Sequence, residues 1–331
     1  MNSTLQTRCE SFIQNKEVIK KTLSWESTYI YPISAAIFTE KGQQADANRL
    51  RQCRDLLKSQ TGIFSSFRGT VRVPAISMLA VDYNPQGKLQ NALKVYNMLK
   101  GHFFSSNYLV LSAMVIAELA EPERYGQIAD RTRILYDRMK AEHPFLTSSE
   151  DSAFAALLAL SPLSDDQLVQ DMERCYELLK GQFFSSNAIQ SLSHVLALGE
   201  GTSEEKCRRT MTLFQTLKNK GYKYGTSYEL ATLGVLALLP EDPEVLAEKM
   251  IQVDQYLSHQ KDFGVLGVGK RQRLMYAGIL VAGEYAGNME HMNLNSAAIS
   301  STISLVIAQQ VAICSAIAAS SAAASSSSSS S

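Results

Sequence analysis

Glycine and proline are scarce in this sequence of 331 residues, with 18 and 8 copies. The pairs Asn-Gly and Asp-Gly, which favour tight hairpin turns, do not occur in it. A β-sandwich or barrel with many tight turns is therefore disfavoured. Apolar residues make up 45% of the chain, enough for a sizeable core and too many for wholesale disorder. The composition predicts a soluble, globular, helical protein.

Charge of one sign is not in excess, because 32 Lys and Arg balance 32 Asp and Glu. A dedicated nucleic-acid binder should be basic, so we expect no nucleic-acid partner. The first twenty residues lack an apolar run of signal-peptide length, and we therefore expect a cytoplasmic protein. No Cys-x-x-C pair occurs, and the cysteines are odd in number and widely spaced, which predicts free core cysteines, no metal site and no cofactor. They are Cys9, Cys53, Cys175, Cys207 and Cys314.

An internal repeat is visible in the sequence. The segment 99–107, Leu-Lys-Gly-His-Phe-Phe-Ser-Ser-Asn, returns at 179–187 with one change, and weaker copies lie around it. The copies share an apolar anchor residue, and successive anchors are 42, 40, 40, 38 and 40 residues apart. The anchors are Leu57, Leu99, Met139, Leu179, Leu217 and Leu257.

Each unit divides into two predicted helices. The segment before the anchor has apolar residues at helical spacing, and an aromatic residue recurs three positions before the anchor. A turn follows, whose phenylalanine (Phe104, Phe145 or Phe184) we expect to pack between the helices. A hydroxyl pair then caps a second, more apolar helix, which should be the inner, more buried one.

The fold class predicted is all-α, with tandem α-hairpin repeats of about 40 residues and about seven hairpins in residues 1–288. Short connections require neighbouring hairpins to touch. The small, apolar second helices favour closure into an α/α-toroid over an open solenoid. Residues 289–324 are expected to form an apolar Ala/Ser-rich helix, and residues 325–331, all Ser, to be unstructured.

The repeated Phe-Phe-Ser-Ser-Asn turn, the length and the Ala/Ser-rich end together resemble the bacterial family called domain of unknown function 4003. The resemblance covers essentially the whole chain. It implies no activity, because that family has none established. At fold level the repeat is also similar to α/α-toroids, which include glycosidases, lyases and terpenoid cyclases.

A polar rim is expected where the inner helices begin, because all these starts should converge on one side of a ring. Its candidate ligand-binding residues mix acids, amides, aromatics and cations. They are Trp25, Glu26, Arg68, Asn107, Tyr108, Asn187, Tyr228, Lys270 and Arg271. Carboxylates at helix starts also have a plain explanation as caps that interact with the helix dipole.

Two functions follow from this rim. The first is a non-enzymatic scaffold that binds a small ligand, an anion or a protein. The second is an α/α-toroid enzyme of hydrolase or lyase type, with Glu150, Asp151 or Glu229 as general acid or base, which requires a carboxyl whose pKa is raised by burial or a like charge. No recognisable catalytic set occurs, so the scaffold is preferred.

The segment Gly264–Arg271 nearly spells a phosphate loop, but Arg271 stands where Ser or Thr should bind Mg²⁺. A nucleotide-hydrolysing site is thus disfavoured. An inter-helix turn is preferred, ahead of an anion site at Lys270 and Arg271, in which Arg273 would be a structural or solvated partner. His102 and His143 share a turn position without companion ligands, and His194 is expected to be a satisfied core histidine.

The tail carries no charged side chain after Glu290. For residues 297–324 we rank a helix that docks on the repeats or on another subunit first, which allows a homo-oligomer. A weak membrane anchor ranks second, because glutamines and serines dilute the apolar stripe and flanking cations are missing. Disorder ranks third.

Overall fold

The structure is a computed structural model that describes residues 1–24, 30–264 and 267–291, with side chains described as far as Tyr285. The described residues form fourteen α-helices and two short 3₁₀ helices, and their only strand-like feature is an isolated bridge between Lys180 and Phe183. The all-α prediction is confirmed. Trp25, Glu26 and the tail from residue 292, including Cys314, lie outside the described residues.

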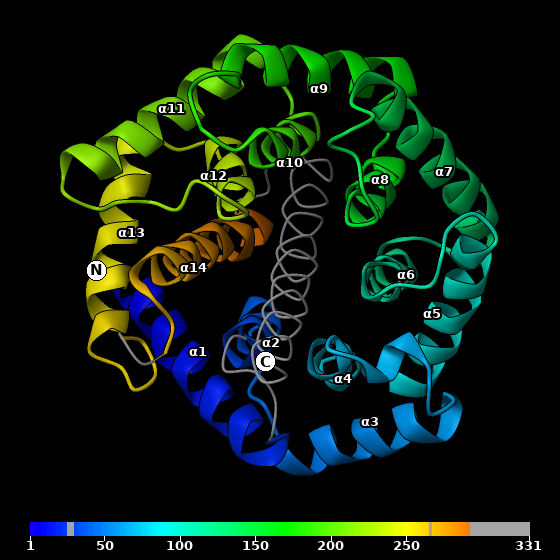
Figure 1. Cartoon of the computed structure of the whole chain (residues 1–331). Coiled ribbons are helices and arrows are strands. Elements are labelled where there is room, and N and C mark those ends of the chain that lie inside the picture. Colours follow the sequence, from blue (N-terminus) through cyan, green and yellow to red (C-terminus); the bar gives the residue numbers. More distant parts are fainter. Residues whose placement is uncertain (25–29, 265–266, 292–331) are drawn as a thin grey trace, which may run out of the picture.

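The helices alternate along the chain between an outer and an inner row, which Figure 1 shows as two concentric layers. The outer helices are α1 (Ser3–Thr22), α3 (Ala47–Gln60), α5 (Pro85–Lys100), α7 (Tyr125–Glu142), α9 (Asp165–Leu179), α11 (Ser203–Asn219) and α13 (Pro243–Ser258). The inner helices are α2 (Ile30–Glu40), α4 (Arg72–Ala80), α6 (Asn107–Leu119), α8 (Asp151–Leu160), α10 (Ser186–Leu196), α12 (Leu230–Ala237) and α14 (Lys270–His291).

The outer helices are amphipathic, and α9 illustrates why they form. The Ser164 Oγ accepts from the Gln167 amide, and the Gln167 Oε1 accepts from the Ser164 amide, which makes a capping box at the first turn. The buried side chains of α9, among them Leu168, Met172 and Leu179, recur at helical spacing and cover one face. The opposite face is polar and meets water.

The inner helices are buried nearly all round. In α8, nine consecutive residues from Asp151 to Ala159 are buried. Leu157, Leu196 and Leu236, on three different inner helices, are at most 3% exposed. The expectation that the second helix of each unit is the more buried one is confirmed.

The expectation for the turn phenylalanines is wrong. Phe104, Phe145 and Phe184 do not pack between helices but are almost fully exposed. A residue just before each of them makes the contact instead, because the turn points successive side chains in different directions. Phe103 meets Tyr136 with ring centroids 5.2 Å apart, and Phe183 meets Phe214 at 5.0 Å.

These contacts explain the aromatic residue that stands three positions before four of the six anchors, at Tyr96, Tyr136, Tyr176 and Phe214. Tyr136 and Phe214 belong to the outer helix of the unit that follows the contacting turn. The same relationship joins Phe67 to Tyr96 at 5.2 Å. The recurring aromatic therefore packs one unit against the preceding one.

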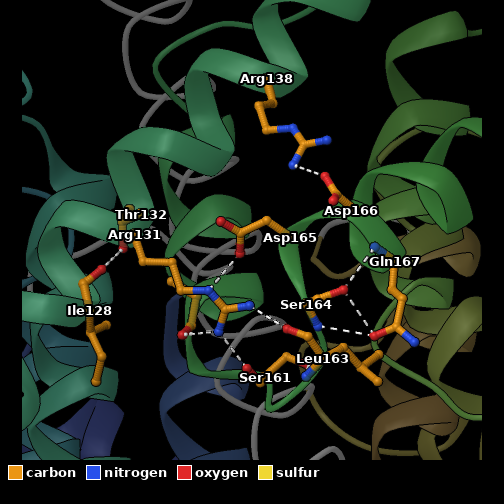
Figure 2. Close-up of polar contacts among 11 residues, drawn as sticks. Ile128, Arg131, Thr132, Arg138, Ser161, Leu163, Ser164, Asp165, Asp166 and Gln167 are labelled. Atoms are coloured by element: carbon orange, nitrogen blue, oxygen red, sulfur yellow. Dashed lines mark hydrogen bonds and ion pairs between the residues drawn. The ribbon is translucent and has the colours of Figure 1, made fainter.

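An arginine on alternate outer helices holds the end of the next inner helix. Figure 2 shows Arg131 of α7, whose Nη1 donates to the carbonyls of Ala159 (3.1 Å) and Ser161 (2.5 Å). Its other nitrogens bond the Leu163 carbonyl and Asp165, the latter at 2.7 Å. The last carbonyls of a helix have no partner within it, so this guanidinium satisfies groups that would otherwise lack one. Arg49 and Arg209, each eight residues before its anchor like Arg131, make equivalent bonds.

The first and last of the described helices are in contact. α1 packs against α13 and α14, and α2 packs against α14. Lys16 of α1 lies 3.0 Å from the Asp262 carboxylate, and Asn2 donates to Glu284 at 2.6 Å. Arg8 pairs with Glu40 of α2 beside Gly283, where a Cβ would overlap both side chains. We call this set of contacts the α1–α14 seam.

Candidate functional site at the starts of the inner helices

The inner helices α6 and α10 begin with the hydroxyl caps that the sequence predicts, whereas α4, α8 and α12 have no side-chain cap. The Ser106 Oγ accepts from the Leu109 amide at 3.3 Å at the start of α6. The Ser185 Oγ accepts from the Ala188 amide at 3.2 Å at the start of α10. The chain before each cap forms a loop from the preceding outer helix, so loop and cap lie at the same end of the inner helix.

Side chains from neighbouring starts meet in pairs. Asn107 donates to the Thr70 hydroxyl at 2.9 Å, one unit back. The Tyr108 hydroxyl lies 3.4 Å from the Glu150 carboxylate, one unit on. Gln272 donates to the Tyr228 hydroxyl at 2.8 Å across the α12–α14 boundary. Of the candidate rim residues, Asn107, Tyr108 and Tyr228 therefore each contact a side chain of an adjacent unit.

Other candidate rim residues stay apart. The Arg68 guanidinium is bonded to the carbonyls of Lys58 and Thr61 at the end of α3. Asn187, Lys270 and Arg271 are exposed, and neither of the last two forms an ion pair with a described residue. The interpretation of Arg273 as a structural partner is confirmed, because it is buried and its Nε lies 2.7 Å from Asp254.

The turn before α14 is held by its own backbone. The Val268 amide donates to the Asp262 carbonyl at 2.8 Å, and a Cβ on Gly267 would overlap that carbonyl. Asp262 itself has a φ of 71° and pairs with Lys16 and Lys20. The described part of this turn fits the preferred interpretation of an inter-helix connection.

The three candidate carboxylates differ in their surroundings. Glu150 is exposed, whereas Asp151 and Glu229 are buried. Asp151 accepts from the Ser148 amide at 2.7 Å, and Glu229 accepts from the Ser227 amide at 3.2 Å. Both buried carboxylates therefore act as local caps for the turn that precedes their helix.

Asp151 meets one physical condition for general acid catalysis. Burial raises the pKa of its carboxyl to about 7, and the like charge of Glu150 acts in the same direction. The Nδ1 of His194 on α10 lies 3.9 Å from the Asp151 Oδ1. Burial lowers the pKa of His194 to about 3, so the imidazole is neutral at neutral pH.

His194 is buried as expected, but it is not a satisfied histidine. Its Nδ1 has no hydrogen-bond partner among the described residues. Asp151 lies beyond hydrogen-bonding distance, and the ring packs instead against Phe154, with centroids 5.2 Å apart. The sequence places these two residues 43 positions apart, and nothing in their spacing indicates that they meet.

An open groove of about 480 Å³ lies between the 100–106 loop and the next unit. Its floor includes Tyr136 of α7 and Ser152 of α8, and its cations are Lys100, Arg133 and Lys140. No carboxylate lines it among the described residues. We call it the Lys100–Lys140 groove.

The cations of the groove are held differently. Arg133 lies 2.8 Å from Asp137 and 5.5 Å above the Phe103 ring centre. Lys100 and Lys140 are exposed and have no acidic partner among the described residues. Sequence reasoning did not single out this groove, although a lysine follows the anchor in five successive units. These lysines are Lys58, Lys100, Lys140, Lys180 and Lys218.

His102 and His143 contact different carboxylates: their Nε2 atoms lie 3.0 Å from Asp130 and Glu173 respectively. In the described part of the chain, no group of three His, Cys, Asp or Glu residues is placed to hold a metal ion. None of the described helices combines the length and apolar character needed to cross a bilayer. Cys9, Cys53, Cys175 and Cys207 are free and buried, as predicted.

The structure thus defines an all-helical protein with outer amphipathic and inner apolar helices and a polar surface where the inner helices start. The chain belongs to the family described as "Protein of unknown function (DUF4003)", which matches residues 15–312 and confirms the resemblance seen in the sequence. It is 26% identical over 323 residues to "Uncharacterized protein YeaA" of Bacillus subtilis (strain 168). That match covers 95% of this chain and 94% of the relative. No solved structure matches the chain significantly.

Proposed function

We propose that this protein is a non-enzymatic binding scaffold, an α/α-toroid of seven helical hairpins whose polar rim receives an anionic ligand or protein segment. The contacts of α1 and α2 with α14 support closure of the ring. A closed ring fixes the relative positions of the inner-helix starts, because each is packed between two neighbours. Binding groups held in this way lose little conformational entropy when a ligand arrives.

The observation that carries the proposal is the Lys100–Lys140 groove. It is open, its volume of about 480 Å³ suits a small ligand, and it combines aromatic side chains with cations. Lys100 and Lys140 approach it from successive outer helices without acidic partners among the described residues. Such a groove favours a phosphate, sulfate or carboxylate group on the ligand.

The test is a thermal-shift screen of the full chain over sugars, nucleotides, phosphates and polyanions. The expected result is stabilisation by anionic compounds alone. The double variant Lys100→Ala/Lys140→Ala should lose that stabilisation and keep the parent's melting temperature without ligand. Lys218→Ala is the matched control, since this exposed lysine has the same position in another unit and lies outside the groove. Equal shifts in the parent and double variant would contradict the proposal.

The second candidate function is an α/α-toroid enzyme of hydrolase or lyase type, with Asp151 as the general acid or base. The raised pKa of the Asp151 carboxyl favours it. However, Asp151 is only 3% exposed and is engaged as a cap, so a substrate would reach it only after a rearrangement. Turnover by the parent protein and its loss in Asp151→Asn, with unchanged ligand binding, would favour the enzyme over the scaffold.

The cytoplasm remains the proposed compartment, and the free, buried cysteines support it because thiols stay reduced there. Docking of residues 297–324 on the repeats or on a second copy also remains a proposal, since these residues lie outside the described part of the chain. Sedimentation equilibrium of the full chain and of a chain ending after His291 would show whether the tail sets the oligomeric state.

A further inference from the structure

Four phenylalanines project from equivalent loops of successive units. Their exposed fractions lie between 97 and 102%, so each ring is covered by almost nothing. Each stands one or two residues before the hydroxyl pair that precedes an inner helix, and all four therefore lie at the same end of the inner helices. They are Phe64, Phe104, Phe145 and Phe184. We call them the phenylalanine crown.

Nothing in the folding of the chain requires phenylalanine at these positions. The neighbouring Phe103 and Phe183 already make the contacts between units, and the crown rings add none. The four rings thus form a row of separate apolar side chains that recur in matching places on one face.

An exposed lysine, the residue that follows the anchor, lies at or near the end of the outer helix before each crown loop. Lys100, Phe104 and Lys140 line one groove, which places the lysine side chains on the same face as the rings. Exposed acids near the crown include Glu142 and Glu150 around one loop and Glu177 beside another. The crown lysines are Lys58, Lys100, Lys140 and Lys180, of which Lys180 pairs with Glu177 at 3.3 Å.

We propose that the phenylalanine crown docks this face of the protein on an anionic lipid surface. The rings would enter the boundary between headgroups and acyl chains, and the lysines would lie at the level of the anionic headgroups. The charge complementarity comes from Lys58, Lys100 and Lys140, which are exposed and form no ion pair with a described residue, whereas Lys180 is paired with Glu177.

The shape of the crown favours a bilayer over a protein partner. Neighbouring units lie roughly 10 Å apart, so four prongs are spread over a broad arc. Figure 1 shows that their loops, from α3–α4 to α9–α10, follow one side of the ring. The prongs have no walls around them, so a protein would need a separate pocket for each, whereas a lipid surface is continuous. This inference concerns the same face as the proposed scaffold, but it does not depend on a ligand in the groove.

The experiment is co-sedimentation of the full chain with vesicles of equimolar phosphatidylcholine and phosphatidylglycerol, beside vesicles of phosphatidylcholine alone. The parent protein should bind the anionic vesicles, and added salt should weaken the binding. The double variant Phe64→Ser/Phe184→Ser should lower the partition coefficient roughly tenfold, and the fourfold serine variant should lower it further. Both variants should fold normally, because the replaced rings are exposed.

The matched control is Tyr83→Ser. Tyr83 is 94% exposed but lies between α4 and α5, at the opposite ends of the helices, so vesicle binding should not change. The double variant leaves the Lys100–Lys140 groove intact, and anion-induced stabilisation should persist in it. If the parent protein binds anionic vesicles but is not stabilised by anions, the result contradicts the proposed ligand-binding scaffold and leaves the inference about the crown standing.

Three outcomes would overturn the inference. The parent protein could fail to bind anionic vesicles. The fourfold variant could bind them as well as the parent, which would assign binding to another part, such as the uncharged tail that both proteins carry. The parent could form oligomers that the fourfold variant does not and show no vesicle binding, which would assign the crown to contact between copies of the chain.

Discussion

The Nδ1 of His194 and the Oδ1 of Asp151 lie 3.9 Å apart between α10 and α8, and burial shifts both groups towards their neutral forms. For the histidine the neutral form is the deprotonated one, whereas for the aspartate it is the protonated one. The two shifts therefore have opposite effects on how stability depends on pH.

The sign for each group follows from its two pKa values. The pKa of Asp151 rises from 3.8 to about 7, so its contribution to stability is present below pH 3.8 and is lost as pH rises towards 7. The pKa of His194 falls from 6.5 to about 3, so its contribution is present above pH 6.5 and is lost as pH falls towards 3. Between about pH 4 and 6.5 the two contributions oppose each other.

Replacing either Asp151 or His194 should reveal the pH dependence of stability that the remaining residue causes. In Asp151→Asn, the free energy of unfolding should rise from pH 4 to 6.5 more steeply than in the parent. In His194→Gln, the free energy of unfolding should fall with pH over the same range when compared with the parent. In each variant the slope should differ from that of the parent by up to about 1.4 kcal/mol per pH unit. Urea unfolding at a series of pH values measures both slopes. Parallel profiles for the parent and the two variants would show that the pair does not titrate in this way. Glu150 and His143, which also act on these groups, are present in all three proteins.

Arg131 should stabilise the fold far more than Arg138, although both lie on α7 and pair with an aspartate at the start of α9. Arg131→Ala leaves the carbonyls at the end of α8 without partners and should cost about 2–3 kcal/mol. Arg138→Ala removes an ion pair whose Asp166 is exposed, so its cost should stay below about 1 kcal/mol. Chemical denaturation compares the two, and equal losses would mean that the carbonyl bonds of Arg131 contribute little.

Gly283→Ala should weaken the α1–α14 seam. The added methyl group would overlap Arg8 and Glu40, and separating this buried pair should cost about 1–3 kcal/mol. Gly126→Ala is the control, because a Cβ on this α7 glycine meets nothing within 4 Å. It should be neutral or stabilise the protein by up to about 1 kcal/mol. Melting curves of both variants test this prediction. An unchanged melting temperature for Gly283→Ala would show that Arg8 and Glu40 can move aside at little cost in stability.

Lys270 and Arg271 carry the remaining anion prediction. Arg273 is held by Asp254, so only the two exposed cations at the start of α14 are free to meet a ligand. If this turn, rather than the Lys100–Lys140 groove, binds the anion, Lys270→Ala/Arg271→Ala should abolish stabilisation by phosphate or sulfate and leave the fold intact, and Lys100→Ala/Lys140→Ala should keep it. Lys261→Ala, an exposed lysine just before the turn, should keep the parent's shift. Should the parent show no shift with either anion, the cluster is simply a solvated helix start.

The order of helices could be predicted from the sequence, because its cause is local. An anchor such as Leu179 recurs near every fortieth residue, and helical spacing around it determines which face is buried. The serine caps follow from the same local pattern. The wrong prediction for Phe104 also has a local cause. Phe103 and Phe104 are adjacent, and only the backbone geometry of the turn decides which of the two rings packs against the next helix.

The contacts between units could not be predicted in the same way. Asp151 and His194 meet because two inner helices are adjacent, and the 43-residue separation carries no signal of it. Arg131 was missed because an arginine on an outer helix is ordinarily a solvated residue. Its position eight residues before the anchor, shared with Arg49 and Arg209, was the available signal.

The packing of α1 on α14 has a consequence for synthesis on the ribosome. Phe12 is buried against Phe263 and Tyr276, with ring centroids 6.0 Å away in both cases. These two partners are translated about 250 residues after Phe12, which takes roughly 10–50 seconds at ordinary elongation rates. During that time the nascent first hairpin has an uncovered apolar face, and a chaperone that binds such faces would meet this end of the protein first.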